Sequence, residues 1–208
     1  MPLTYIYREW ILANLKNSTD ITYTELTPDH FAAVLELGNR VQGDGYLNLD
    51  NLTDYYQRGL KDGINAGIVA FYRDQLVGFR LTFAQGQWDI DQWATPAEWD
   101  VDPATVCYFK CNTVDPAMQG YGIGSTLLSK AIDAAQRQGS NAGLAHIWLA
   151  SPGNSAFKYF SKNGGRLIKE HPNKWQYAAM YEGYDCPVCD SLCACVAAEM
   201  LLTFSQQK

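Results

Sequence analysis

A short glycine-rich stretch between a predicted strand and a predicted helix constrains this 208-residue chain more than any other feature. Gly120, Gly122 and Gly124 stand between the apolar run 106–114 and a set of apolar residues over 127–135 with helical spacing. Glycine has no side chain, so a ligand can approach the backbone N–H groups closely. At a helix start those groups lack intrahelical partners, and the helix dipole favours an anion. The stretch therefore predicts a pyrophosphate cradle between a strand and a helix.

Two other phosphate-binding loops do not fit this spacing. The dinucleotide-binding fingerprint is G-x-G-x-x-G, whereas this chain has G-x-G-x-G followed by Ser125. The P-loop requires Gly-Lys-Ser/Thr at the helix start, and the first lysine after these glycines is Lys130. The remaining alternative is a glycine-rich turn that binds no ligand.

The loop from Gln119 to Gly124 resembles the Q/R-x-x-G-x-G/A loop of the GNAT superfamily of N-acetyltransferases, which holds the pyrophosphate of acetyl-CoA. The preceding Val114-Asp115-Pro116 resembles the family's strand end and bend, and Leu127-Leu128 resembles its helix opening. The resemblance spans about residues 21–181. It implies an α/β, GNAT-like fold, in which a central mixed, mostly antiparallel sheet of about six to seven strands is flanked by about four helices. A short C-terminal cysteine-rich tail would follow this fold.

The resemblance also implies positions for coenzyme binding and catalysis. In the family, the strand end before the loop binds pantetheine through main-chain groups, and an asparagine near the start of a later helix contacts the same arm. The coenzyme-binding candidates are thus Asn112, Thr113, Val114, Gln119, Gly120, Tyr121, Gly122, Ile123, Gly124, Ser125 and Asn154.

Many members also carry a tyrosine on that later helix, which protonates the leaving thiolate. Counting from Asn154 places Ser161 at this position, while counting back from Gly164 places Phe160 there. Tyr159 lies one or two residues away. The catalytic candidates are therefore Tyr159 and Ser161, with solvent as another source of the proton and core packing as the alternative role of Tyr159.

The resemblance implies an enzyme that moves an acetyl or other acyl group from its CoA thioester directly to a primary amine in a ternary complex. Acetyl-CoA would be the co-substrate, and the acceptor a small-molecule, peptide or protein amine. A non-catalytic acyl-CoA-binding sensor or interaction module is the alternative, which the displaced tyrosine favours. No general base can be named, because His30, His146 and His171 lie far apart in the sequence.

Charge and hydropathy argue against two classes of partner. The formal net charge is −6, which disfavours nucleic acid because phosphate binding depends on clustered Lys and Arg. No apolar run has the length of a membrane span, and the N-terminal residues lack a signal-peptide core. We therefore expect a cytoplasmic protein with neither nucleic-acid nor membrane partners, whose six cysteines are reduced. Its oligomeric state does not follow from the sequence.

Three segments are expected, with an unusual insertion in the second. An N-terminal extension over 1–20 would pack on a GNAT-like acyl-CoA-binding domain over 21–182, followed by a cysteine-containing appendage over 183–208. The insertion 85–104 contains three tryptophans and five carboxylates but no Lys, Arg or His. It is either a lid that presents carboxylates and aromatic faces to a protonated amine, or a solvated loop whose tryptophans pack on the sheet edge.

The appendage contains four cysteines within ten residues: Cys186, Cys189, Cys193 and Cys195. Four thiols can ligate one Zn²⁺, and the Cys-Pro-x-Cys segment resembles a zinc knuckle. However, 190–204 also has a helical pattern, and on a helix Cys193 and Cys195 would point in nearly opposite directions. The four cysteines are thus candidate metal ligands, with packed or redox-labile thiols as the alternative.

Periodicity and turn residues predict the remaining elements. Strands are expected at 21–26, 67–72, 76–84, 106–114, 144–150, 166–171 and 175–181. Helices are expected from residue 28 onward, at 52–60, after the glycine loop and at 154–163.

Overall fold

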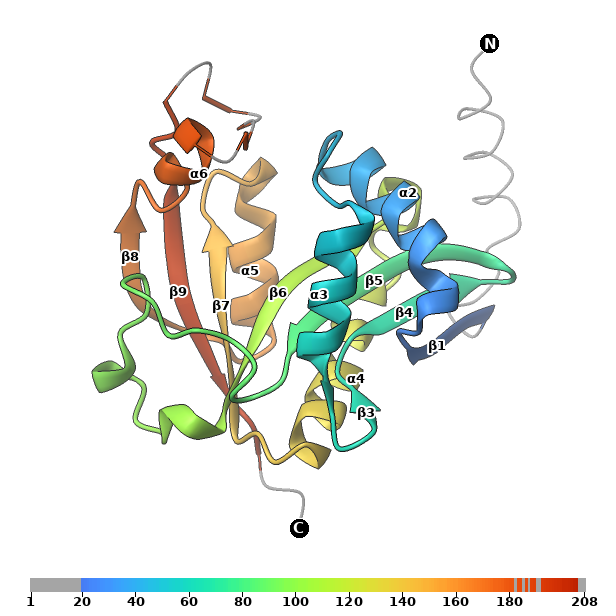
Figure 1. The fold of residues 1–208 in the computed structure, drawn as a ribbon, viewed down its shortest axis with the longest axis horizontal. Coiled ribbons are helices and arrows are strands. Elements are labelled where there is room, and N and C mark those ends of the chain that lie inside the picture. The colour runs from blue at the N-terminus through green and yellow to red at the C-terminus, as the bar shows by residue number, and fades with distance from the viewer. Residues whose placement is uncertain (1–19, 182, 185, 187, 190–191, 206–208) are drawn as a thin grey trace.

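The computed structural model describes residues 20–205 except 182, 185, 187 and 190–191 (Figure 1). The predicted N-terminal extension lies outside the described residues, apart from Asp20. No helix in the described part of the chain is both long and apolar enough to cross a membrane.

A seven-stranded sheet with the order β1-β4-β5-β6-β7-β9-β8 forms the centre of the fold. Only β6 and β7 pair in parallel, and all other neighbouring strands of this sheet are antiparallel. This confirms the predicted mixed, mostly antiparallel sheet. A separate two-stranded ribbon joins β2 (Leu60–Lys61) to β3 (Ile64–Asn65). The strands of the large sheet are β1 (Ile21–Glu25), β4 (Ile68–Tyr72), β5 (Gln75–Phe83), β6 (Val106–Val114), β7 (Ala142–Trp148), β8 (Arg166–Pro172) and β9 (Val196–Thr203).

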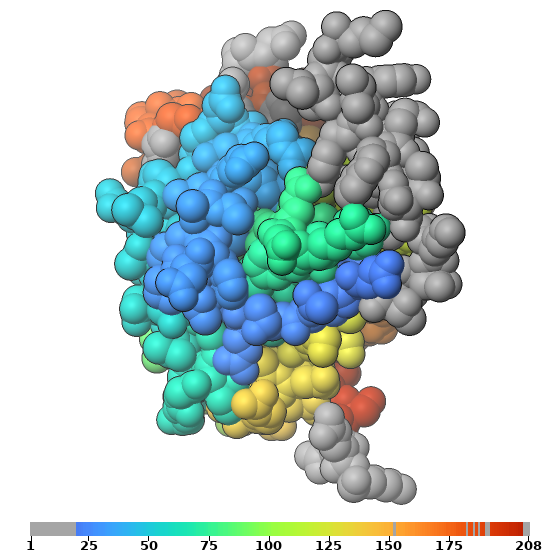
Figure 2. All heavy atoms as spheres, turned by 90° about the vertical axis from the view of Figure 1, so that its right-hand side faces the viewer, coloured from blue at the N-terminus to red at the C-terminus, as the bar shows by residue number. Residues whose placement is uncertain are grey.

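Helices cover both faces of the sheet. On one face lie α2 (Phe31–Gln42) and α3 (Leu49–Gly59), whose apolar side chains form a core cluster with Val69, Phe79 and Leu81. On the other face lie α4 (Ile123–Arg137) and α5 (Ser155–Lys162). Viewed from the β1 edge, α2 in blue and α4 in yellow lie on opposite sides of that edge (Figure 2).

The buried face of α4 follows directly from its sequence. Its buried side chains recur at three- and four-residue spacing, which is the pattern that predicts an amphipathic helix. All of them except Ala134 pack with Met200 and Leu202 of β9 and with Phe160 of α5 in one core cluster. The buried residues of α4 are Ile123, Leu127, Leu128, Ala131, Ala134 and Ala135.

Two segments have a different secondary structure from the one that their sequence pattern predicts. The run 175–181, predicted as a strand, forms the helix α6 (Gln176–Tyr181). The run 190–204, which has a helical pattern, contains strand β9, so residues 196–203 of the predicted appendage lie inside the sheet between β7 and β8. Because β9 is buried on both faces, its apolar run does not alternate, and periodicity cannot distinguish it from a buried helix.

Two tryptophans of the insertion pack on the face of the sheet that carries α2 and α3. Trp99 is fully buried in a cluster with Val106, Leu144 and Leu201. Trp88 donates from Nε1 to the carbonyl of Val106 at 2.8 Å. Trp88 and Trp99 thus hold the insertion against the sheet. This is the second role considered from the sequence, in which the tryptophans of the insertion pack on the sheet.

A buried carboxylate on β9, Glu199, ties the insertion to the sheet. Its Oε1 accepts from the backbone of Thr95 at 2.8 Å and from Trp99 Nε1 at 2.7 Å. Its Oε2 accepts from Thr95 Oγ1 at 2.7 Å and lies 2.9 Å from His171 Nε2 on β8. Burial alone would raise the pKa of Glu199, but these hydrogen bonds outweigh burial and lower the pKa.

Replacing Glu199 by alanine is expected to lower the free energy of unfolding by about 3 kcal/mol, because it leaves buried donors and His171 without their acceptor. Glu199→Gln keeps an acceptor oxygen and should cost less. Urea unfolding followed by tryptophan fluorescence measures both effects. The control is Glu170→Ala on the exposed side of β8, expected to change stability by less than about 0.5 kcal/mol. Equal stability of Glu199→Ala and the control would contradict the anchoring role.

Candidate active site

Strands β6 and β7 pair only at their N-terminal ends. The last paired residues are Tyr108 and Leu144, and beyond them β6 stays paired with β5 alone. Figure 1 shows β6 bending away from β7 in this region. A β-bulge accompanies the bend, because Leu81 pairs with Cys111 and Thr82 with Phe109, which leaves the residue between them unpaired with β5. The predicted pantetheine-binding residues lie on this diverging end of β6: Asn112, Thr113 and Val114.

Asp115 holds the bend between β6 and the glycine loop. Its backbone amide donates to the carbonyl of Val77 on β5 at 2.9 Å. Its buried carboxylate accepts from the amide of Ala117 at 2.9 Å and pairs with Arg40 of α2 at 2.9 Å. The chain is therefore anchored to β5 and to α2 immediately before the glycines.

The glycine loop presents a row of free backbone donors. None of the amides of residues 120–125 donates a hydrogen bond to another group in the described part of the chain, and Thr126 is the first to bond, to the carbonyl of Gly122 at 3.0 Å. Gly120 and Gly122 have φ of +89° and +77°, and a Cβ at either would meet nothing within 4 Å. Free amides beside open space at a helix start are the arrangement that binds an anion. The predicted loop residues Gln119, Gly120, Tyr121, Gly122, Ile123, Gly124 and Ser125 thus lie together at the N-terminus of α4.

Helix α5 turns Tyr159 toward this loop. The Tyr159 hydroxyl donates to the carbonyl of Gly124 at 2.7 Å. Burial raises the pKa of Tyr159, and the nearby Arg80 opposes that rise. The other catalytic candidate, Ser161, has an exposed side chain, and Phe160 is buried against Phe109. The helical phase of α5 therefore brings one of the two candidates, Tyr159, to the glycine loop.

Arg80 on β5 is a buried cation that the sequence analysis did not identify. It is 3% exposed, and its Nη1 lies 3.5 Å from the Tyr159 hydroxyl. Its guanidinium carbon lies 4.6 Å from the centre of the Phe109 ring, and its Nε has no hydrogen-bond partner among the described residues. Burial lowers the pKa of Arg80. One feature of the sequence could have indicated this residue, because Arg80 is the one charged residue in the apolar predicted strand 76–84.

Two asparagines leave buried acceptors, Asn112 beside the loop and Asn154 at the start of α5. The Oδ1 atoms of Asn112 and Asn154 have no hydrogen-bond partner within the described part of the chain. Asn154 precedes α5 in a left-handed conformation, with φ of +53°. A Cβ at Gly124 would lie 3.2 Å from Asn112 Nδ2, so the Asn112 side chain lies against the loop. Each unpaired oxygen can accept a hydrogen bond from a ligand.

His146 on β7 is a satisfied internal histidine. Its Nε2 lies 2.6 Å from the carbonyl of Trp93, so this nitrogen carries the proton, and Nδ1 accepts from the Tyr108 hydroxyl at 3.1 Å. Burial lowers the pKa of His146 to about 4, so the ring is neutral at pH 7. With both ring nitrogens engaged, His146 is not free to act as a general base in this arrangement.

The four candidate metal ligands of the tail come together between the ends of β7 and β9. The sulfur atoms of Cys186, Cys189, Cys193 and Cys195 all lie within 4.8 Å of one another. On a helix, Cys193 and Cys195 would point in nearly opposite directions. The structure instead has strand β9 from Val196, directly after Cys195.

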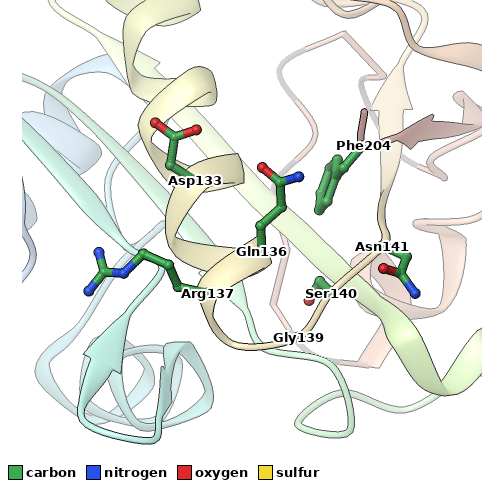
Figure 3. A pocket seen from close by; sticks show the side chains of 7 residues that line it. All are labelled: Asp133, Gln136, Arg137, Gly139, Ser140, Asn141 and Phe204. Carbon is green, nitrogen blue, oxygen red and sulfur yellow. The ribbon is translucent and has the colours of Figure 1, made fainter. Parts of the chain in front are cut away.

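A cavity of about 500 Å³ lies at the opposite end of α4 from the glycine loop (Figure 3). None of the predicted site residues lines it. Its lining residues are Asp133, Gln136, Arg137, Gly139, Ser140, Asn141 and Phe204.

Several solved structures share this fold at low sequence identity. A putative acetyltransferase, yncA from Salmonella typhimurium with its cofactor acetyl-CoA, is 18% identical over 90% of this chain and 96% of that one, with a TM-score of 0.64. The ribosomal-protein-S18-alanine N-acetyltransferase of Escherichia coli is 15% identical over 90% and 96%, with a TM-score of 0.63. Naa50 of Arabidopsis thaliana, in complex with the bisubstrate analogue CoA-Ac-MVNAL, is 17% identical over 89% and 99%, with a TM-score of 0.59.

No curated protein matches the chain in sequence. The model of the acetyltransferase (GNAT) family matches residues 23–164, which include the diverging end of β6, the glycine loop and α5. The chain therefore belongs to the acetyltransferase (GNAT) family.

Proposed function

We propose that this protein is an acetyl-CoA-dependent N-acetyltransferase that moves the acetyl group directly to a primary amine in a ternary complex. The reaction class follows from the family. The observation that carries the coenzyme assignment is the row of unpaired amides over 120–125, which lies at the positive end of the α4 dipole and beside open space. The yncA structure with acetyl-CoA and the Naa50 structure with a CoA-containing analogue support this assignment.

Acetyl-CoA, when bound, supplies the activated acetyl thioester. Different residues around the loop would bind its pyrophosphate and its pantetheine arm. The amides of Gln119–Ser125 would hold the pyrophosphate. The backbone groups of Asn112–Val114 that face the diverging β7 have no strand partner there and would bind the pantetheine amides. The unpaired Oδ1 of Asn154 would accept from an amide N–H of the same arm.

Tyr159 is our candidate for the proton donor to the leaving thiolate. Its raised pKa keeps the hydroxyl protonated at neutral pH, so it has a proton to give. The phenolate formed on donation would lie beside the Arg80 guanidinium, and an opposite charge at this distance stabilises the ionised form. Arg80 is therefore a positioning residue that acts through Tyr159.

The acceptor is a primary amine of a small molecule, a peptide or a protein. Asp89 and Asp91 of the insertion are exposed, and Asp91 lies 4.0 Å from Lys174 Nζ, so Asp89 is the carboxylate of this pair that favours a cationic acceptor. The test of the whole proposal is a titration with acetyl-CoA followed by an assay of thiol release across a panel of amines. Saturable binding with amine-dependent release is expected. Saturable binding without release would identify a non-catalytic acyl-CoA-binding module, and an absence of binding would contradict both.

Replacing Gly122 by alanine is expected to weaken acetyl-CoA binding by about 10- to 150-fold, the equivalent of one charge-assisted hydrogen bond. The added Cβ would enter the open space beside the amides. Isothermal titration measures the Kd. Gly63→Ala is the matched control, because Gly63 has almost the same φ, +75°, and equally open surroundings in the turn between β2 and β3. Binding of equal strength in the two variants would show that the loop is not the cradle.

Tyr159→Phe is expected to lower kcat on the order of 100-fold, a typical loss for a general acid, while the Kd for acetyl-CoA stays within about twofold. Steady-state kinetics and binding measurements on the same preparation separate the two quantities. Ser161→Ala should retain kcat, because that side chain is exposed. A variant Tyr159→Phe that loses affinity or stability but keeps kcat would assign Tyr159 to packing instead.

A further inference from the structure

The tail cysteines have no part in the proposed transfer, yet they form the one group of three or more metal-ligating side chains that converges in the described part of the chain. Cys193 is fully buried, and Cys186 and Cys195 are at most 7% exposed. All six cysteines are unbonded thiols. The cluster therefore requires a chemical explanation other than disulfide bonding.

The spacing of the sulfur atoms fits a tetrahedral metal site. Cys195 Sγ lies 3.7 Å from the sulfur atoms of both Cys186 and Cys189, and the remaining separations are below 4.8 Å. Zinc–thiolate bonds of about 2.3 Å in a regular tetrahedron place the sulfur atoms about 3.8 Å apart. The four thiols thus need only small side-chain shifts to surround one ion.

The surroundings of the cluster also fit a bound metal. Trp148, Trp175 and Tyr184 pack around the sulfur atoms and shield them from water. The backbone amides of Val188 and Cys189 donate toward the Cys186 sulfur, and such N–H···S contacts orient a thiolate ligand and stabilise its charge. Thiols are weak hydrogen-bonding groups, so four of them gathered together gain little from one another without a metal.

We propose that Cys186, Cys189, Cys193 and Cys195 bind one Zn²⁺ in a closed, structural tetrathiolate site. Each thiol loses its proton on binding, and four protein ligands leave no open position for a substrate. The site lies outside residues 23–164, the part of the chain that the family model matches. It would hold the connection between α6 and β9 against the end of β7, where Leu149 already donates to the carbonyl of Val196 at 3.1 Å.

The experiment uses the full chain, purified under reducing conditions and dialysed against metal-free buffer. Elemental analysis is expected to find one zinc per chain. Replacement by Co²⁺ is expected to give thiolate charge-transfer bands and the intense visible bands of a tetrahedral tetrathiolate complex. These measurements on the unmodified protein need no variant that might fail to fold.

Cys193→Ser and Cys186→Ser should each lose the zinc. The chain's two other cysteines provide matched controls, since Cys107→Ser and Cys111→Ser remove a thiol outside the cluster and should retain one zinc per chain. A metal-free protein, whether with four thiols or with two disulfides, would overturn the proposal. Zinc that remains bound in both cluster variants, or iron in place of zinc, would also overturn it.

Discussion

The divergence of β6 from β7 is the constraint on which the rest of this structure depends. Backbone N–H and C=O groups need partners, and a parallel strand pair that separates after Tyr108 and Leu144 leaves a row of them unpaired. The next free donors along the chain lie at the start of α4. The unpaired groups of β6 and the free amides of α4 could therefore bind the same extended ligand, if it has amides at one end and phosphates at the other. Acetyl-CoA has this composition.

The Phe109 ring packs next to the point where the two strands separate. A Cβ at Gly143 of β7 would lie 2.2 Å from the Phe109 ring, so glycine is required there for that ring to cross from β6 over β7. Phe109 also contacts Phe160 of α5 and lies beneath the Arg80 guanidinium. One aromatic side chain thus packs over β7, supports α5 and contacts the cation beside Tyr159.

Local signals made the fold and the glycine loop predictable, whereas long-range contacts decided the features that were missed. The φ-permissive glycines, the preceding strand and the apolar stripe of α4 are contiguous, so the sequence contains them as one pattern. Strand β9 has a helical pattern in the sequence because it is buried on both faces by partners far away in the chain. Helix α6 has no buried residues, so its sequence carries no apolar stripe that would distinguish a short helix from a strand. Arg80 and Glu199 are single polar residues in apolar strands, and their roles become evident only with partners such as Tyr159, Trp99 and His171. The choice between Tyr159 and Ser161 depended on the phase of α5, which residue counting could not fix.

The insertion and the connection between β8 and β9 form one coupled unit. Lys174 joins them, because its Nζ lies 4.0 Å from Asp91 Oδ2 and 5.4 Å from the centre of the Trp93 ring. The carbonyl of Trp93 in turn accepts from His146 on β7, just beyond the point where β6 and β7 separate. A displacement of either segment would therefore reach β7 through Trp93. The insertion lies inside the region that the family model matches and the connection lies outside it, so these contacts join the matched part of the chain to the part that follows it.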